Sequence, residues 1–270
     1  GSSSRREISH FLDGLVTEGA LSYGEIVKSA NYCNIPLYSP YICALISFTE
    51  QNRLLQTSEW LGTSALLRSQ LADKWEMLSG NISYAFAKYN NVILVLQQSE
   101  SLPVYEQVAL VREYCGDLMK MLSAKGQDRG VIFGIGDPVP SLAEFCRSYS
   151  QALRTVDLAS RICDERIATY RRYILCELIY DSPNAKLALI QRIKPLLAYD
   201  EEHNTQLLYT LETYFNNCQN SVKTSKALFI HRNTLLYRLD RIAEILDLNY
   251  NDSEQMLTFQ LALKAFLMCQ

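Results

Sequence analysis

The sequence predicts an α+β fold followed by an all-α domain, and two observations lead to this prediction. Up to about residue 165, short apolar runs of strand length alternate with longer segments of helical periodicity. From about residue 201 onward, apolar residues recur only at helical spacing. The order strand, helix, hairpin, helix, strand, helix indicates an antiparallel-containing sheet covered by helices. The segments that we expect are residues 1–34, 35–165, 166–200 and 201–270.

The N-terminal segment, residues 1–34, is expected to hold two helices. Residues Gly1 to Ser4 resemble a tag remnant, and no signal peptide follows them. Ile8, Phe11 and Leu15 then lie on one helical face. The two helices are either a connector from an upstream sensor domain or ordinary helices that pack on the following domain.

Residues 35–165 contain the predicted sheet. Its strands are expected at Tyr41–Phe48, Ile82–Ala87, Val92–Gln97 and Gly130–Ile135, with a hairpin turn at Lys88–Asn91. Three helices are expected, at about residues 63–78, at Val104–Ala124 and at about residues 141–162. In the first helix Leu66, Leu67 and Leu71 are expected to point inward. The third helix is expected to begin with a capping box of Ser141 and Glu144.

Other chemical motifs in this part of the chain are weak. Gly134 and Gly136 form only half of a dinucleotide-binding motif, and Asp137-Pro138 follows them, so a plain strand-to-loop turn is the preferred interpretation. The serines lack the surroundings of a hydrolase nucleophile. The eight cysteines and three histidines are scattered, which favours reduced thiols and predicts neither a metal site nor a cofactor.

Residues 166–200 are expected to be a helical connector between the two domains. The pattern is interrupted at Asp181 to Pro183 and again at Pro195. Arg171 and Arg172 could touch DNA, but a solvated surface pair is the preferred interpretation.

The domain at residues 201–270 is organised around one amphipathic helix. Leu235, Leu239, Ile242 and Leu246 form its apolar stripe. The opposite face and its flanks are basic and amide-bearing in the first half and acidic in the second. A recognition helix has this character, because its N-terminal end enters the major groove.

A shorter helix, about Ser221–Leu228, is the expected partner of this helix. Asn220 or Ser221 can cap it, and Ala227 is a small residue at which two helices could cross closely. Phe229 stands where a left-handed turn usually has glycine, so we expect a reshaped turn in which Phe229 packs inward.

A last helix follows, with Asp252 and Gln255 forming an approximate capping box. It is apolar on nearly all sides. Such a helix either packs within its own domain or contributes to a two-fold dimer contact.

The charge of the chain is local. Residues 221–246 carry five basic and two acidic residues, a net +3, whereas the whole chain has a net charge of −3. This asymmetry suits attraction to phosphate.

The run from Ala227 to Leu239, with its His231-Arg-Asn-Thr-Leu235 core, closely resembles the C-terminal helix-turn-helix of the PucR/CdaR family of bacterial transcriptional regulators, and more loosely the Fis-type helix-turn-helix. Residues 35–165 resemble, more weakly, the degenerate GGDEF-like domain of that family. The resemblance implies a regulator, more often an activator, of genes for small-molecule catabolism or transport, responding to an effector that the sequence does not identify.

We expect the protein to bind inverted-repeat double-stranded DNA as a homodimer. Arg suits guanine and Asn suits adenine, so Arg232 and Asn233 are the expected base contacts, and Leu236 or Tyr237 could meet a thymine methyl. The expected phosphate contacts are Lys223, Lys226, Thr234, Arg238 and Arg241, with His231 as a helix cap or a further phosphate contact. The plain structural alternative is a helical hairpin with a solvated basic face.

An enzyme is not expected. An active diguanylate cyclase needs carboxylates on its first strand and in the hairpin turn to hold Mg²⁺, and neither Ser47-Phe48-Thr49 nor Lys88–Asn91 supplies them. The domain is therefore interpreted as a scaffold for dimerisation or signal relay. The alternatives are a nucleotide-binding or residually enzymatic GGDEF-type module, or a purely structural interaction protein. No apolar run approaches membrane-spanning length, so no membrane partner is expected and the protein is expected to be cytoplasmic.

Overall fold

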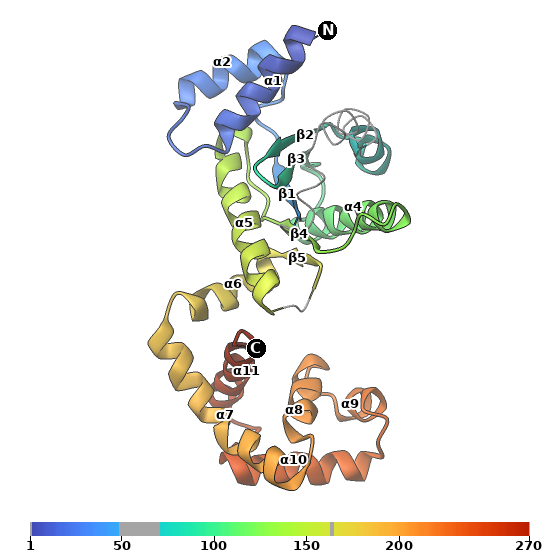
Figure 1. The fold of residues 1–270 in the computed structure, drawn as a ribbon, viewed down its shortest axis with the longest axis vertical. Helices are drawn as coiled ribbons and strands as arrows, with labels where there is room; N and C mark the ends of the chain where they lie inside the picture. Colours follow the sequence, from blue (N-terminus) through green and yellow to red (C-terminus); the bar gives the residue numbers. More distant parts are fainter. Residues whose placement is uncertain (1, 49–70, 163–164, 270) are drawn as a thin grey trace. The chain divides into compact units, whose positions relative to one another are not determined.

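The computed structural model describes residues 2–48, 71–162 and 165–269, which fall into two units, Gly1–Ile174 and Leu175–Gln270. Figure 1 shows the elements of each unit. The N-terminal unit is built on a five-stranded sheet, and the C-terminal unit is all helical. The predicted fold class is confirmed.

The sheet has the strand order β2-β3-β1-β4-β5. Its strands are β1 (Tyr41–Phe48), β2 (Ser83–Lys88), β3 (Asn91–Gln97), β4 (Val131–Ile135) and β5 (Ile167–Thr169). The first four confirm the predicted strands and hairpin, and they pair antiparallel.

The fifth strand corrects the prediction that residues 166–200 are a helical connector. Residues Ile167 to Thr169 pair in parallel with β4. A run of three residues is too short to show strand alternation, and its partner is distant in the sequence. Its pairing could therefore not be seen in the sequence pattern.

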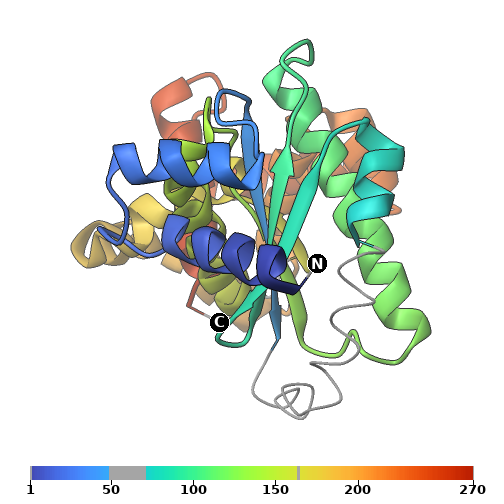
Figure 2. The same cartoon turned by 90° about the horizontal axis from the view of Figure 1, so that it is seen from above.

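Both faces of the sheet are covered, because side chains along β1 alternate between two cores. Cys43 and Leu45 belong to one core, with α1 (Ser2–Leu15), α2 (Tyr23–Cys33) and α5 (Phe145–Ile162). Ile42 and Ala44 belong to the other, with α4 (Val104–Ala124) and Trp75 of the helical residues 71–79. Figure 2 shows the strands between these two helical layers. The two N-terminal helices thus pack on the sheet, as one of the two interpretations expected.

The helix predicted at residues 63–78 is confirmed for its described part. Residues 71–79 are helical and Leu71 is buried in the core, whereas Leu66 and Leu67 lie outside the described residues.

Close contact between β4 and α5 explains the two glycines near the end of β4. A Cβ atom on Gly134 would lie 2.4 Å from the Ala152 carbonyl oxygen, and one on Gly136 would lie 2.1 Å from that of Ser148. The backbone amide of Gly136 donates to the Cys43 carbonyl (3.0 Å). These glycines therefore serve packing, and the strand-to-loop interpretation holds.

The capping box predicted at Ser141 is wrong. Leu142–Glu144 form a 3-10 turn, η2, and α5 begins at Phe145. The Ser141 side chain makes no capping hydrogen bond. Its carbonyl accepts the Glu144 amide instead (3.1 Å), since a 3-10 turn joins residues three apart.

The C-terminal unit begins at Leu175, within α6 (Tyr170–Tyr180). Its helices are α7 (Pro183–His203), α8 (Leu207–Asn216), α9 (Ser221–Ala227), α10 (Arg232–Leu246) and α11 (Ser253–Leu267). Its core joins Ile193 of α7, Leu211 of α8, Leu235 of α10 and Phe259 of α11, all buried.

The helix α7 runs through Pro195, so the predicted interruption there is wrong, whereas the break before Pro183 is confirmed. Pro195 and Gln191 are both exposed. The Gln191 carbonyl, which loses its helical donor at the proline, can therefore be hydrated. Among the described residues, no helix combines the length and apolar character needed to cross a membrane.

Candidate nucleic-acid interface

The helix α10 is anchored by one face and leaves the other exposed. Leu235, Leu239, Ile242 and Leu246 are all buried, which confirms the predicted stripe. Of the residues expected to contact bases, Arg232 and Asn233 are exposed in the first turn, Leu236 is 39% exposed and Tyr237 is 71% exposed. The structure thus places these four side chains at or near the N-terminal end of α10.

His231 caps α10, as expected. It has extended backbone geometry, and the backbone amide of Asn233 donates to its Nδ1 (3.2 Å). A ring nitrogen that accepts a hydrogen bond carries no proton, so Nε2 carries the ring hydrogen and can donate to a ligand.

Loss of this cap gives a measurable prediction. Replacing His231 by alanine leaves an amide of the first turn without its acceptor, and we expect the free energy of unfolding of the C-terminal unit to fall by about 1 kcal/mol. Asparagine at this position also caps helices, so His231→Asn is the matched control and should retain most of the stability. Urea denaturation followed by circular dichroism measures both; equal stability of His231→Ala and the wild type would contradict the role as a cap.

The partner helix α9 is capped by Asn220, whose Oδ1 accepts the Lys223 amide (2.9 Å). The expectation that Ala227 lies at the helix crossing is wrong, because Ala227 is exposed and Thr224 and Ser225 are buried instead. Their hydroxyl groups donate to the carbonyl oxygens of Asn220 (2.8 Å) and Val222 (3.1 Å). These small polar side chains can be buried because their hydrogen bonds are satisfied within α9.

The turn between α9 and α10 corrects the expectation for Phe229. This residue adopts the left-handed conformation itself (φ 54°), and its side chain is 96% exposed rather than packed inward. The Ile230 amide donates to the Ser225 carbonyl (3.0 Å) and the Phe229 amide to that of Lys226 (3.2 Å). This is a Schellman turn, in which glycine normally takes the left-handed place. The neighbours Leu228 and Ile230 pack against the core.

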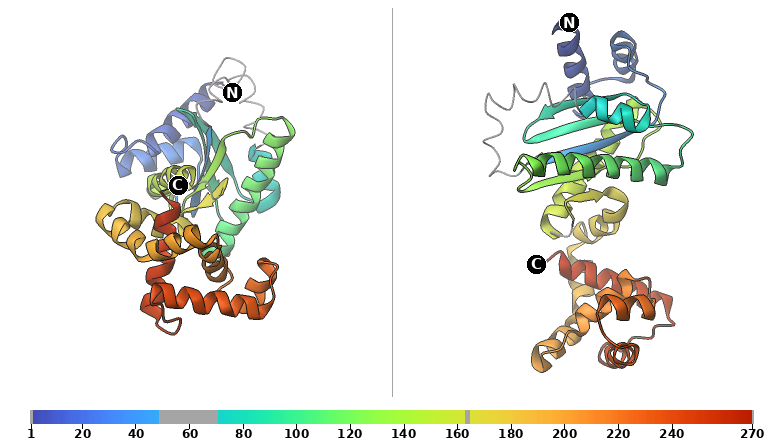
Figure 3. Two further views of the ribbon diagram at one scale, coloured as in Figure 1. Left: turned by 60° about the horizontal axis from the view of Figure 1, so that its bottom comes forward. Right: turned by 90° about the vertical axis from the view of Figure 1, so that its right-hand side faces the viewer.

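The residues expected to contact phosphate fall into two groups. Lys223, Lys226 and Thr234 are exposed on α9 and the start of α10. The left panel of Figure 3 shows α10 in red-orange, with the shorter α9 at one of its ends. The helices α9 and α10 contact each other, so these three exposed residues belong to the same helix pair as His231, Arg232 and Asn233.

Arg238 and Arg241 have partners within the unit. Arg238 Nη1 donates to Oγ1 of the buried Thr210 on α8 (3.1 Å). Arg241 pairs with Glu244 (2.6 Å), donates to Tyr199 Oη (3.3 Å), and lies over the Tyr199 ring. The hydrogen bonds to Tyr199 and Glu244 raise the pKa of Arg241. The pair Arg241 and Glu244 can be seen in the sequence, because residues three apart are neighbours on a helix. The contacts of Arg241 with Tyr199 of α7 and of Arg238 with Thr210 of α8 cannot, because they join different helices.

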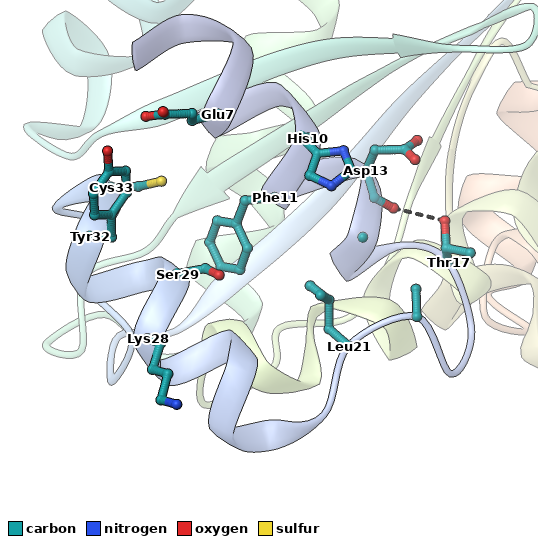
Figure 4. A pocket seen from close by; sticks show the side chains of 12 residues that line it. Glu7, His10, Phe11, Asp13, Thr17, Leu21, Lys28, Ser29, Tyr32 and Cys33 are labelled. Carbon is teal, nitrogen blue, oxygen red and sulfur yellow. Dashed lines mark hydrogen bonds between the residues drawn. The ribbon is translucent and has the colours of Figure 1, made fainter. Parts of the chain in front are cut away.

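The N-terminal unit has a cavity of about 650 Å³ between α1 and α2, shown in Figure 4. Its polar lining carries both signs of charge, and its apolar lining includes Phe11 and Leu21. The polar residues are Glu7, His10, Asp13, Thr17, Lys28, Ser29, Tyr32 and Cys33. Lys88 of the β2–β3 hairpin donates to Asp13 (2.8 Å) and Thr17 (2.9 Å) of this lining. In the described part of the chain, no three His, Cys, Asp or Glu side chains are grouped to hold a metal ion.

Comparisons with known families match both units. Residues 207–265 match the PucR C-terminal helix-turn-helix domain, and residues 18–158 match the GGDEF-like domain. The second match begins before α2 and ends within α5, so it includes four of the five strands.

Three curated relatives are named as regulators. The chain is 27% identical to the proline-responsive transcriptional activator PutR of Bacillus subtilis over 65% of this chain and 43% of that protein. It is 24% identical to the purine catabolism regulatory protein of the same organism over 97% of this chain and 49% of that protein. It is 30% identical to the carbohydrate diacid regulator of Escherichia coli over 48% of this chain and 34% of that protein. The chain thus spans less than half the length of each of these relatives.

Proposed function

The chain belongs to the PucR/CdaR family of transcriptional regulators, with a GGDEF-like domain followed by a PucR-type helix-turn-helix, and from this premise we propose that it regulates transcription by binding double-stranded DNA through α9 and α10. The observation that carries the proposal is the anchoring of α10, which buries an apolar stripe and exposes Arg232 and Asn233 in its first turn. The names of the relatives support genes of small-molecule catabolism as targets and activation as the mode of control, and we propose genes of small-molecule transport as further targets.

The proposed base contacts follow from hydrogen-bonding chemistry. The Arg232 guanidinium can donate two parallel bonds to guanine, and the Asn233 amide can both donate to and accept from adenine. Tyr237 and Leu236 lie further along α10 and offer apolar surface to a thymine methyl. These residues would select the sequence, and phosphate contacts would fix the register of the helix.

The proposed phosphate contacts differ in strength. Lys223 and Lys226 are exposed cations near the recognition end, and Thr234 and the His231 Nε2 hydrogen can donate hydrogen bonds there. We expect Arg238 and Arg241 to contribute less, because binding phosphate would require them to leave or share the Thr210, Tyr199 and Glu244 contacts.

Replacing Lys226 by alanine tests this ranking. We expect weaker binding to all DNA sequences alike and a salt slope of log K that is shallower by about one, because one fewer counterion is released. Arg241→Ala should change the slope less. Lys194→Ala, which removes an exposed charge on α7, is the matched control and should leave the slope unchanged. Anisotropy titrations between low and moderate salt measure all three, and an unchanged slope in Lys226→Ala would remove Lys226 from the interface.

A homodimer on an inverted repeat is part of the proposal, because a two-fold axis would present one α10 to each half-site. The helix α11 supports it: Met256, Phe259 and Leu263 are buried in the unit, whereas Leu257 on another face is 51% exposed and Leu261 is half-buried. An apolar face left outside the core suits contact with a second copy.

For the GGDEF-like unit we propose a non-catalytic role in dimerisation or signal relay, in a cytoplasmic protein. The hairpin supports this role, since its Lys88 is bonded to Asp13 of α1 and to Thr17 just after α1. The cavity between α1 and α2 has the size and mixed lining of a small-molecule site, so it is our candidate for the effector. The alternative, a nucleotide-binding module, requires guanine nucleotide binding that is lost on changes at residues 88–91.

The experiment that tests the proposed function is fluorescence anisotropy with promoter DNA from the operon of this protein and with a scrambled duplex. We expect tighter binding to the promoter. Equal, weak binding to both duplexes would contradict sequence-specific regulation by this chain.

A further inference from the structure

Phe229 combines two features that both oppose folding. Its backbone is left-handed, which is costly for a bulky side chain. Its ring is the most exposed of the large apolar side chains in the described part of the chain. Neither feature is explained by the turn, because glycine would make the same Schellman turn without strain.

Two other helix ends of the C-terminal unit show that the chain has a simpler solution available. The left-handed residue after α7 is Asn204 and the one after α10 is Asp247, both residue types that tolerate this conformation. After α8 the left-handed residues are Cys218 and Gln219, and neither carries a ring. Only at the end of α9 does an aromatic residue occupy a left-handed helix end among those described.

The core does not account for the ring either. Leu228 and Ile230, on the two sides of Phe229 in the sequence, supply the inward packing of the turn. Strain that a structure retains at one residue is often linked to function. The ring is therefore available for a contact outside the unit.

The position of Phe229 indicates which contact this is. Its amide is bonded to the Lys226 carbonyl (3.2 Å), and Arg232 and Asn233 follow three and four residues later. In the sequence, Phe229 therefore lies between Lys226, a proposed phosphate contact, and the proposed base contacts Arg232 and Asn233. Apolar surface on a duplex at this place consists of thymine methyl groups in the major groove and the deoxyribose rings that border it.

We propose that Phe229 is a DNA-contacting residue whose ring packs on this apolar surface of the duplex. The inference rests on the proposed function, because it requires that the N-terminal end of α10 enters the major groove. It adds a contact that contributes affinity through burial of a ring and not through charge. The left-handed backbone is the cost of directing that ring away from the core.

The test replaces Phe229 by glycine, which removes the ring and the strain together. We expect an unchanged or higher melting temperature, because glycine suits the turn. We expect promoter DNA to bind about tenfold more weakly, the factor that corresponds to losing the burial of one aromatic side chain. The salt slope should not change, in contrast to Lys226→Ala. Phe229→Asn, which also tolerates the left-handed conformation, should behave in the same way.

The control is Tyr209→Ala, which removes an exposed aromatic ring from α8 and should leave DNA affinity unchanged. Duplexes with uracil in place of thymine distinguish the two surfaces. If uracil weakens binding of the wild type more than binding of Phe229→Gly, the ring contacts a methyl group, because any contact of Leu236 or Tyr237 with a methyl group is present in both proteins. If uracil weakens both equally but Phe229→Gly still binds thymine DNA more weakly than the wild type, the ring contacts deoxyribose.

The inference fails separately from the proposed function. If wild type prefers its promoter and Phe229→Gly binds that promoter equally well, the DNA role of Phe229 is overturned and the regulator proposal stands. A change in sedimentation of Phe229→Gly at unchanged DNA affinity would likewise overturn it and assign the ring to a protein contact. If wild type shows no promoter preference at all, both proposals fall.

Discussion

Replacing Arg232 and Asn233 together by alanine is expected to remove the preference of the protein for its operator while leaving binding to random DNA nearly intact. Both side chains are exposed in the first turn of α10, beyond the His231 cap. Each base contact contributes roughly 1–3 kcal/mol to the discrimination between bases. The double variant should therefore bind the operator at least about tenfold more weakly. Its discrimination between bases should be lost only at the base pairs that the two residues contact.

Anisotropy titrations of the wild type and the variant on operator, single half-site and scrambled duplexes measure this effect. The stripe residues that hold α10 in the core are unchanged, so circular dichroism should show the same melting temperature. Lys194→Ala again serves as the control, since it removes an exposed side chain outside α9 and α10. An equal loss on operator and scrambled DNA would show that Arg232 and Asn233 contact phosphate and do not select bases.

Of the substitutions proposed for this protein, Gly136→Ala is expected to lower the free energy of unfolding most, by about 3 kcal/mol or more. The new Cβ would lie 2.1 Å from the Ser148 carbonyl oxygen, a distance that requires backbone movement. Moving α5 away from the sheet would also strain the hydrogen bond from the Cys43 amide to Ser148 Oγ (2.9 Å). The substitution should therefore weaken the packing of α5 against both β1 and β4.

Gly116 provides the matched control, because nothing lies within 4 Å of the position of its Cβ and it stands inside α4. Alanine there should be neutral or should stabilise by up to about 1 kcal/mol. Urea and thermal denaturation of the two variants measure the difference. If Gly136→Ala and Gly116→Ala melt at the same temperature, the close approach of α5 to β4 is not a constraint on the fold.

Much of the fold could be predicted because it is local. The bounds of Tyr41–Phe48 and Val104–Ala124 were predicted as observed, since an apolar run or a helical stripe is contained in the segment itself. The strand β5 was missed because its pairing with β4 is not local. The continuity of α7 through Pro195 was missed because it depends on exposure of the proline, which the sequence does not state.

The candidate site divides in the same way. The His231 cap and the buried stripe of α10 were predicted, since both depend on neighbours along the helix. Three other features depend on packing between helices and could not be predicted. They are the burial of Thr224 in place of Ala227, the bond between Arg238 and Thr210, and the outward ring of Phe229. The sequence therefore predicts which residues are basic, but it does not show that Lys223 and Lys226 are exposed whereas Arg238 and Arg241 have partners within the unit.

The bonds of Lys88 to Asp13 and Thr17 also bear on which residues the hairpin tolerates at this position. Lys88, the last residue of β2, lies 2.8 Å from the Asp13 carboxylate of α1. An acidic residue in place of Lys88 would set two negative charges side by side and remove a bond between the hairpin and α1. The residue that suits this end of the hairpin is therefore determined in part by a carboxylate on a different element, 75 positions earlier in the chain.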